Sequence, residues 1–472
     1  MRSFRFIARA MVCAAVVLLW VGFSSGQQPG WQAGVAASRI TPEAPLWMAG
    51  YAARDHAAEG TLHDLWVKAL ALEDAAGHRA VVVTSDLLGF PRQMYETICE
   101  QLEKDCGLRR SQVMLTASHT HCGPVIGRSL SDCYPLDDDQ RRLIDRYSQA
   151  LEKTVIATAK RALGELAPAT FWAGGGRTPF AVNRRNYRSQ ELPPIDQRTE
   201  KLEGPSDHSV PVLAIRSPDG RLRAVVFGYA CHNTTLADYQ WCGDYAGFAQ
   251  LELEQKHAGA AAMFYAGCGA DQNPLPRRSV DLCRQYGQML AAAVDEALAA
   301  PMRRLEPRLA TAFAFVRLDF QPPPAEEELN ALAAGSNYRA RWARRLLGEI
   351  ERGEPLARSY PYPVQVWRLG TEQLWIALGG EVVVDYPLIL KEKFGAEAWV
   401  AGYANDVMAY IPSHRVWEEG GYEAGAFEVY GLPSSGWAEG VEERIVACVT
   451  RLVGQLGGDA SRQEVGGGDS RR

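Results

Sequence analysis

One stretch organises this sequence: Ala117-Ser118-His119-Thr120-His121-Cys122-Gly123-Pro124, directly after the apolar run Val113-Met114-Leu115. The apolar run predicts a buried strand, and Gly123-Pro124 predicts a turn after it. Because side chains alternate along a strand, His119 and His121 are predicted to project from one face where the strand gives way to a loop. Two neighbouring imidazoles are typical of a metal or proton-transfer site, but histidines at a strand end are as often ordinary surface or core groups. The rest of the chain has to decide between these interpretations.

Other strand ends carry residues of the same chemical kind. Apolar runs predicted as strands lead to His232, to Asp271 and to Glu381, and Tyr410 has a similar position. Sites in mixed α/β folds are commonly built from such strand ends. The recurring pattern therefore favours a site that gathers side chains from several distant segments.

The remaining pattern predicts an α/β protein with mixed β-sheets and flanking helices. The triple proline at 322–324 marks a boundary, and 325–357 is predicted as a charged helical insertion with solvated polar faces. Gly174-Gly175-Gly176-Arg177 is predicted to begin a loop-rich passage. Strands are predicted at 34–42, 63–73, 79–84, 210–215, 223–229, 260–265, 364–369, 375–378 and 399–403, and helices at 92–106, 139–164 and 248–256.

The composition is that of a globular protein. The 472 residues are 47% apolar and 22% charged, which allows one large domain or two ordinary ones. The formal net charge is -6, and no long basic or acidic block interrupts the chain. These features give no indication of nucleic-acid binding and favour a small or weakly charged ligand.

Residues 1–26 have the organisation of a signal peptide. Arg2, Arg5 and Arg9 precede the apolar segment 11–23, and Ser24-Ser25-Gly26 offers small residues for cleavage. The apolar segment is shorter than the roughly 20 residues that a membrane-spanning helix needs. We therefore expect an exported, soluble protein without a transmembrane segment, with one domain at 27–456 and a disordered tail at 457–472.

Nine cysteines follow the predicted signal peptide, so at least one stays unpaired within the chain. Some disulfides are expected in an exported protein. Cys99 with Cys106, or Cys122 with Cys133, are near enough in sequence to consider, but the connectivity stays open. No CxxC pair is present, which argues against a zinc site built from cysteines.

Several of these segments together resemble the catalytic, N-terminal domain of the neutral (alkaline, non-lysosomal) ceramidases. Ser118-His119-Thr120-His121-Cys122-Gly123-Pro124 is similar to the family signature THTHSGP. The resemblance covers most of residues 32 to 435 in pieces and in the family's order, and it implies the family's α/β catalytic fold. The other similar pieces are Ile40-Thr41-Pro42, Met48–Ala52, Gly60–Asp64, Asn183-Arg184, Tyr229–His232, Gly379-Gly380-Glu381, Asn405–Tyr410 and Tyr422–Gly425.

The resemblance implies a zinc ion held by His119, His232, Glu381 and Tyr410. Imidazoles and a carboxylate bind zinc firmly, whereas a phenol is a weaker ligand that leaves the ion strongly Lewis-acidic. Such an ion lowers the pKa of a water to about 7 and polarises a carbonyl. Alternatives stay open, because Glu381 after two glycines can be a turn acid and Tyr410 can be a packing aromatic.

The same resemblance implies catalytic roles for three further residues. His121 would act beside the metal in proton transfer, Arg184 would hold a substrate oxygen, and Tyr422 would stabilise the oxyanion through its hydroxyl. The twelve-residue spacing between Tyr410 and Tyr422 matches that expected for the two family tyrosines. Tyr422 can equally be a packing aromatic.

The chain departs from the family at the active-site serine. The family stretch is like NAGDVSPN, and its counterpart Cys268-Gly269-Ala270-Asp271-Gln272-Asn273-Pro274 has Asn273 in the serine position. An amide cannot be the nucleophile that a hydroxyl can be. We therefore expect attack by zinc-activated water, with Asp271 as general base or orienting group and Asn273 as a hydrogen-bond donor. Cys268 is an alternative nucleophile, although a partly buried cysteine is more often inert.

The leading hypothesis is an exported zinc-dependent amidohydrolase that acts on an N-acyl amide, either a small molecule or a ceramide-like lipid. A lipid substrate would allow peripheral contact with a membrane. The missing serine favours a second hypothesis, a zinc hydrolase of a different ester or amide. A third is a non-catalytic binding protein on a decayed enzyme scaffold.

Overall fold

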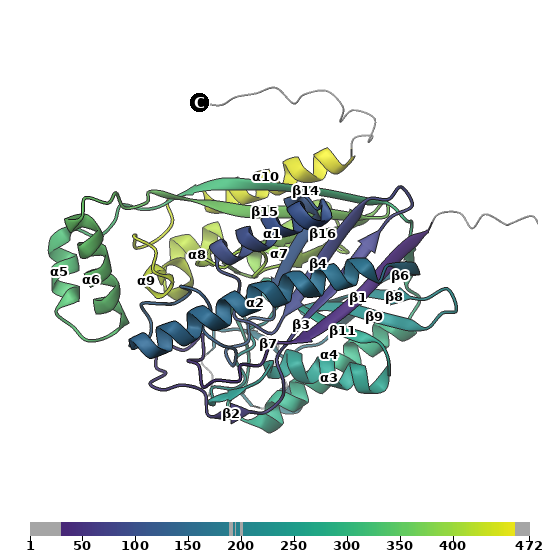
Figure 1. The fold of residues 1–472 in the computed structure, drawn as a ribbon, viewed down its shortest axis with the longest axis horizontal. Coiled ribbons are helices and arrows are strands. Elements are labelled where there is room, and N and C mark those ends of the chain that lie inside the picture. Colours follow the sequence, from purple (N-terminus) through teal and green to yellow (C-terminus); the bar gives the residue numbers. More distant parts are fainter. Residues whose placement is uncertain (1–29, 188–191, 194, 199–201, 458–472) are drawn as a thin grey trace, which may run out of the picture.

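The computed structural model describes residues 30–187, 192–193, 195–198 and 202–457, which form four layers of helices and sheets (Figure 1). The predicted signal peptide, and the predicted tail beyond residue 457, lie outside the described residues. None of the helices in these described ranges is both long enough and apolar enough to cross a membrane.

The largest sheet has nine strands: β1 (Trp31–Arg39), β3 (Trp66–Glu73), β4 (Arg79–Ser85), β5 (Val113–Ala117), β6 (Ala167–Arg177), β8 (Ser209–Arg216), β9 (Leu222–Tyr229), β11 (Ala261–Ala266) and β13 (Arg303–Leu305). Their order is β11-β9-β8-β6-β1-β3-β4-β5, and β13 also pairs with β6. β4 pairs in parallel with β5, and β9 with β11. Most of these strands read as nearly continuous apolar runs because both faces of the sheet are covered.

A four-stranded sheet packs on one face of the nine-stranded sheet. It consists of β14 (Leu309–Asp319), β15 (Ser359–Leu369), β16 (Gln373–Leu378) and β18 (Trp399–Ala401), in that order. Val82 and Met263 of the larger sheet share one buried cluster with Trp367 and Trp375 of the smaller one. The interface between the sheets is therefore a core built on large aromatic side chains.

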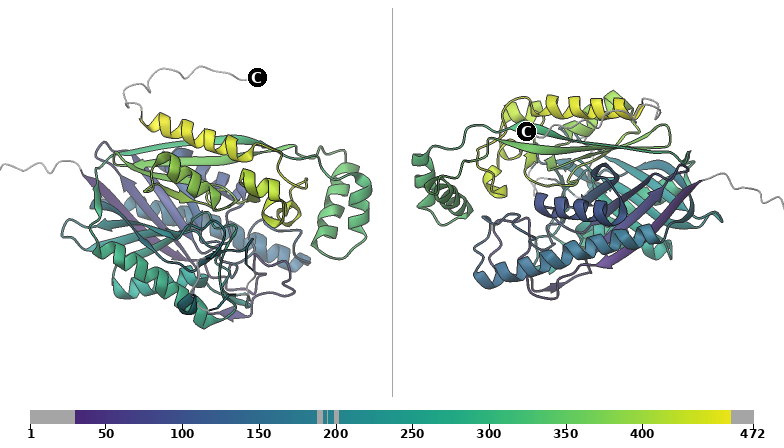
Figure 2. Two further views of the ribbon diagram at one scale, coloured as in Figure 1. Left: turned by 180° about the vertical axis from the view of Figure 1, so that it is seen from behind. Right: turned by 45° about the horizontal axis from the view of Figure 1, so that its top comes forward.

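Helices form the two outer layers, as the views in Figure 2 show. The helices α1 (Arg92–Cys106), α2 (Asp138–Gly164), α3 (Asp244–Lys256) and α4 (Val280–Ala299) cover the free face of the nine-stranded sheet. The helices α7 (Asp385–Phe394) and α10 (Val441–Gly457) cover the free face of the four-stranded sheet. The helices α4 and α10 each bury one apolar stripe against their sheet.

The remaining elements are short and lie around the ends of the sheets. Two helices, α5 (Glu326–Ala333) and α6 (Tyr338–Glu351), form an insertion with its own small core around Trp342, at the far left in Figure 1. The others are α8 (His414–Glu419), α9 (Phe427–Tyr430), the helical turns Arg110–Gln112, Ile195–Gln197 and Tyr422–Ala424, and the strand pairs β2 (Gly60–Thr61) with β10 (Gln240–Trp241), β7 (Ala181–Asn183) with β12 (Gln272–Pro274), and β17 (Glu381–Val382) with β19 (Tyr410–Ile411).

One segment, Ala401–Asn405, joins the two outermost strands of the nine-stranded sheet, and we call it the seam segment. The outermost strands β5 and β11 lie in contact. Ala401 forms a β-bridge with Gly267, directly after β11, and Ala404 forms one with Thr116 in β5. Because β9 is the neighbour of β11, the seam segment brings the ends of β5 and β9 to one place.

Most of the predicted elements are confirmed. The hairpin of β3 and β4, the hairpin of β8 and β9, the helices α1 and α2, and the helical insertion lie close to their predicted bounds. The loop predicted at Gly174-Gly175-Gly176-Arg177 is wrong, because these residues are the end of β6. The glycines are needed there for packing: a Cβ on Gly176 would clash with the Ala293 carbonyl of α4. The strand β14 and the helices α4 and α10 were not predicted.

The expected disulfides are absent, since all nine described cysteines are free thiols. Cys99 and Cys106 lie seven residues apart on α1, and a helix rises about 10 Å over that distance, beyond the reach of a disulfide. Cys133 instead points its Sγ at the Val429 carbonyl oxygen, 3.2 Å away.

Asp406 is a buried carboxyl that makes part of the stability depend on pH. Its Oδ2 accepts a hydrogen bond from the Tyr360 hydroxyl at 2.6 Å, and burial raises the pKa of Asp406 to about 7. In the unfolded chain the pKa is near 4, so the folded state binds more protons between about pH 4 and pH 7. The stabilising contribution of this carboxyl is therefore complete below about pH 4 and is lost as the pH rises through about 7.

Asp406→Asn is expected to match the parent protein in stability near pH 4 and to exceed it at pH 8 by up to about 4 kcal/mol, because the amide stays neutral. Urea unfolding followed by intrinsic fluorescence at both pH values measures this difference. A difference that does not change with pH would contradict the raised pKa.

Candidate metal centre

The strand ends bring three of the four predicted metal ligands, His119, His232 and Glu381, around one point, and Tyr410 lies beside Glu381. His119 follows β5 with a left-handed φ of 59°, and His232 follows β9. Glu381 begins β17 and Tyr410 begins β19, and these two strands pair in parallel with Glu381 opposite Tyr410. The nine-stranded sheet therefore supplies the two histidines, and segments that follow strands of the smaller sheet supply the carboxylate and the phenol.

Three potential ligand atoms face one another. The Nε2 atoms of His119 and His232 lie 3.2 Å and 3.1 Å from Glu381 Oε2. The Nδ1 of His119 lies 2.7 Å from the Leu88 carbonyl oxygen, and the Nδ1 of His232 lies 2.8 Å from the Gly269 carbonyl oxygen. A carbonyl only accepts hydrogen bonds, so in each neutral ring Nδ1 carries the proton and Nε2 presents a lone pair. Backbone carbonyls orient metal-binding imidazoles in this way.

Two of these atoms lack hydrogen-bond partners. His232 Nε2 and Glu381 Oε2 are among the buried side-chain atoms of the described residues that have none. Unpaired buried polar atoms are costly, and a cation between the three side chains would satisfy them. Two imidazoles and a carboxylate, with a phenol close by, are a donor set that fits zinc.

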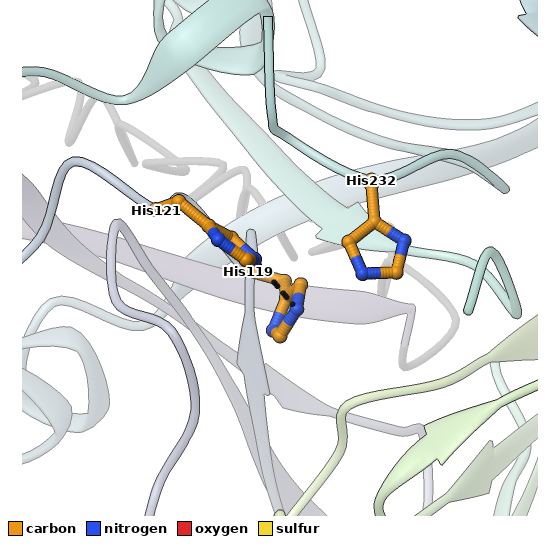
Figure 3. Close-up of side chains that lie close together, drawn as sticks. All are labelled: His119, His121 and His232. Carbon is orange, nitrogen blue, oxygen red and sulfur yellow. Dashed lines mark hydrogen bonds between the residues drawn. The ribbon is translucent and has the colours of Figure 1, made fainter. Parts of the chain in front are cut away.

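His121 lies beside the same point. Its Nε2 is 3.2 Å from His119 Nε2, and Figure 3 shows these two rings together with the His232 ring across from them. The three histidines are buried, and each offers a nitrogen within 4.8 Å of the others, so they form a group that could hold a metal ion. Gly50 makes room for the ring, since a Cβ there would clash with His121. The proton-transfer role of His121 stays a prediction, because a histidine at this position could either bind the metal ion directly or act beside a histidine that does.

Burial favours the neutral form of two of the imidazoles, those of His232 and His121. Desolvation, assisted by the charge of Arg184, lowers the pKa of His232 to about 4. Desolvation and the neighbouring histidines hold the pKa of His121 well below its usual range. Neutral imidazoles are the form that binds a metal ion.

Tyr410, Tyr422 and Arg184 lie together on the outer side of the centre. The Arg184 Nη2 donates to the Tyr410 hydroxyl at 3.3 Å, and the rings of Tyr410 and Tyr422 are 5.1 Å apart. Tyr410 is buried, whereas Tyr422 is 51% exposed. Glu423 fixes the guanidinium, since its Oε1 accepts from Arg184 Nε at 2.7 Å. The predicted tyrosine pair and the predicted arginine are thus brought together.

Tyr430 is a residue of this centre that the sequence did not indicate. Its buried hydroxyl donates to Glu381 Oε1, on the carboxylate oxygen that does not face the histidines. It lies on the four-residue helix α9, which packs against α6 of the insertion. No strand end or motif precedes Tyr430, so only the tertiary structure identifies it.

Asp271 and Asn273 have different surroundings. Asp271 is fully buried, its Oδ1 accepts from the Val384 N–H at 2.8 Å, and its Oδ2 accepts from Asn183 Nδ2 at 3.0 Å. With both oxygens engaged, its contacts favour the orienting role over the general base. Asn273 lies in β12 and lines a surface pocket, where its amide can meet a substrate. Both catalytic roles stay predictions.

The pocket has a volume of about 610 Å³ and shares Arg184 and Tyr422 with the centre. Its described lining includes four arginines and two glutamates, which are Arg184, Arg185, Arg277, Arg415, Glu419 and Glu423. We call it the arginine-lined pocket. Because it shares these residues with the centre, the pocket lies next to the outer side of the centre.

The sequence matches the profile of a family described as neutral/alkaline non-lysosomal ceramidase, N-terminal, over residues 31–292. The chain belongs to this family. The matched range includes His119, His121, Arg184 and His232, while Glu381 and the two paired tyrosines lie beyond it.

Known ceramidases resemble this chain in sequence and in fold. The neutral ceramidase of Pseudomonas aeruginosa is 26% identical over 227 residues, which are 47% of this ceramidase-family chain and 33% of the relative. The chain therefore spans about a third of the length of the curated relative it matches. Its fold is shared by the crystal structure of neutral ceramidase from Pseudomonas aeruginosa, with a TM-score of 0.67, 20% identity, and coverage of 90% of this chain and 75% of that one. A structure described as ceramidase complexed with C2 matches with a TM-score of 0.66 and 21% identity. That match covers 90% of this chain and 76% of the other. The predicted fold class is confirmed.

Proposed function

We propose that this protein is an exported, zinc-dependent amidohydrolase that hydrolyses an N-acyl amide of the ceramide-like class. One observation carries the proposal: the Nε2 atoms of His119 and His232 converge on Glu381 Oε2 in a buried centre. Family membership supports the reaction class. The proposal takes 27–456 as one hydrolase domain behind a signal peptide at 1–26.

His119, His232, Glu381 and Tyr410 would hold the ion in this proposal. Bound there, zinc supplies the Lewis acidity that activates water and polarises an amide carbonyl. The Leu88 and Gly269 carbonyls orient the two imidazoles, and Tyr430 orients the carboxylate. The protein thereby fixes the ligand geometry before the substrate arrives.

The other residues would act on the substrate. Arg184 would hold a substrate oxygen, Tyr422 would donate its hydroxyl to the developing oxyanion, and Asn273 would donate from its amide. Hydrolysis adds water across the C–N bond, so the attacking water loses a proton and the leaving amine gains one. His121, which is buried beside the centre, would carry this proton.

The proposal is tested by measuring zinc in the purified mature protein together with hydrolysis of a short-chain ceramide, before and after a chelator. We expect about one zinc ion per chain, loss of hydrolysis on chelation and recovery on adding zinc. Hydrolysis that survives complete metal removal would contradict the proposal. Zinc binding without turnover of any amide or ester would favour a binding protein instead.

A different amide or ester substrate is the second candidate function. Asn273 in the position of the family serine favours it, because Asn273 lines the pocket at the centre. Comparing ceramide with other acyl amides and esters under the same conditions distinguishes the two.

A further inference from the structure

The helix α9, which carries Tyr430, depends on its surroundings for its conformation. It has four residues, and a single helical turn is not stable by itself. The residues that flank it, Ala426 and Gly431, have left-handed φ angles of 57° and 76°. An alanine carries a steric cost in this region, so the structure around α9 has to impose it. The neighbours of α9 therefore decide where the Tyr430 hydroxyl lies.

Two side chains of the insertion bind the backbone directly after Tyr430. Arg345 Nη2 donates to the Gly431 carbonyl oxygen at 2.6 Å. Trp342 Nε1 donates to the Leu432 carbonyl oxygen at 2.9 Å. Both donors lie on α6, three residues apart, so they project from the same side of this helix. The side of α6 that carries Trp342 and Arg345 therefore faces the segment of Tyr430.

Arg345 is held in one orientation by three acceptors. Its Nε pairs with Asp132 Oδ2 at 2.9 Å, and its Nη1 pairs with Glu349 Oε1 at 2.6 Å. The Gly431 carbonyl is the third acceptor, and a planar guanidinium that binds three groups has little freedom to turn. A Cβ on Gly431 would lie 3.1 Å from Arg345 Nη2 and 3.3 Å from Asp132 Oδ2. Arg345 therefore fits closely between the loop of Asp132 and the end of α9.

The loop that contains Asp132 also binds both the insertion and α9. Arg341 of α6 donates from Nε to the Asp132 carbonyl at 2.9 Å and from Nη2 to the Cys133 carbonyl at 2.6 Å. Cys133 Sγ donates in turn to the Val429 carbonyl oxygen at 3.2 Å. Side chains from outside α9 therefore bind the backbone on both sides of Tyr430.

Tyr430 connects this arrangement to the candidate metal centre. Its hydroxyl donates to Glu381 Oε1, and the other oxygen, Oε2, faces His119 and His232. A shift of α9 would withdraw the hydroxyl and allow the carboxylate to rotate away from the histidines. The position of α9 therefore controls the direction in which Glu381 presents Oε2.

We infer that the insertion of α5 and α6 positions the carboxylate of the centre, with Arg345 and Trp342 acting through Tyr430 on Glu381. The inference rests on the proposed metal centre and adds the residues that set its geometry. Arg345 and Trp342 are positioning residues, because they hold the segment whose tyrosine orients the ligand. Partners of this kind typically change metal affinity by about 10- to 100-fold.

The test measures zinc affinity by competition with a chromogenic chelator. Tyr430→Phe is expected to weaken zinc binding by about 10- to 100-fold, because it deletes the hydroxyl that orients Glu381. Arg345→Gln and Trp342→Phe should each weaken it by about 3- to 10-fold, because each removes one of the hydrogen bonds that hold α9. Trp342→Phe keeps an aromatic ring in the core of the insertion, so it deletes the N–H donor with little loss of packing.

A double-variant cycle separates positioning from a general loss of stability. If Arg345 acts through Tyr430, the combination of Arg345→Gln with Tyr430→Phe should bind zinc no more weakly than Tyr430→Phe alone. Losses that multiply would show that Arg345 acts independently of Tyr430, and would overturn the inference. Arg352→Gln is the matched control, because Arg352 lies at the end of α6 and pairs with Glu354 at 2.8 Å. It should leave zinc affinity unchanged.

Hydrogen exchange of the metal-free protein separates the inference from the proposed function. The amides of residues 427–432 should exchange faster in Arg345→Gln and Trp342→Phe than in the parent or in Arg352→Gln. Unchanged exchange, or unchanged zinc affinity, in both variants would overturn the inference and leave the proposed function standing. A parent protein that binds no zinc would overturn the proposed function. Faster exchange, together with a non-additive loss of stability of Arg345→Gln and Tyr430→Phe in urea, would then still support the positioning of Glu381, and additive losses would overturn it.

Discussion

His119→Ala is expected to remove both the metal ion and the hydrolytic activity. The variant deletes one of the four proposed ligands, whose Nε2 lies 3.2 Å from Glu381 Oε2, and we expect the remaining three to bind the ion too weakly to retain it. A metal ion contributes several kcal/mol to transition-state stabilisation, so activity should fall by about 10³-fold or more. Zinc content by elemental mass spectrometry and amide hydrolysis measure the two effects.

His78→Ala is the matched control for this variant. His78 lies in the turn between β3 and β4, its side chain is 63% exposed, and it pairs with Asp74 away from the centre. It should keep both zinc and activity. A His119→Ala protein that is folded and retains its zinc and its activity would exclude His119 as a ligand.

Gly269→Ala is expected to displace His232 and to destabilise the fold. A Cβ on Gly269 would lie 2.7 Å from Cys231 Cα and 2.8 Å from the Ala230 carbonyl carbon, both of which are backbone atoms that cannot turn aside. The Gly269 carbonyl also accepts the His232 Nδ1 proton, so moving this segment tilts the imidazole. Overpacking of this kind costs about 1–3 kcal/mol, and weakened ligand orientation should reduce zinc affinity by about 10- to 100-fold.

Urea unfolding of the metal-free protein and zinc titration measure these two effects separately. Gly164→Ala is the control, because no atom lies within 4 Å of its added Cβ at the end of α2. Alanine is favoured in helices, so this control should be neutral or slightly more stable. Zinc affinity unchanged in Gly269→Ala would show that the carbonyl of Gly269 does not position His232.

The sequence could predict the elements whose pattern is local. The alternating run of β3, the amphipathic α2 and the double-histidine stretch after β5 each carry their signal within a few residues. The glycines at the end of β6 were mistaken for a loop, because their reason is the close approach of α4, which no local pattern reveals.

The same limit applies to the candidate centre. His119, His232, Glu381 and Tyr410 follow strands and match family segments, so they could be proposed as one site before the fold was known. Tyr430 contacts Glu381 across 49 residues of sequence, and Arg277 reaches the pocket from a loop after β12. Such partners depend on how the loops pack, which the sequence pattern does not encode.

The seam segment also occupies backbone groups at the outermost strands of the nine-stranded sheet. An outermost strand normally presents unpaired N–H and C=O groups, which can recruit a strand from another chain and start aggregation. Here the strand β5 and the residue that follows β11 each bridge to the seam segment instead. Asn405 extends this cover, since its N–H donates to the Leu115 carbonyl at 2.7 Å and its Oδ1 accepts from the Leu115 N–H at 3.0 Å. The contact that gathers the strand ends at the centre therefore also occupies edges that another chain could otherwise join.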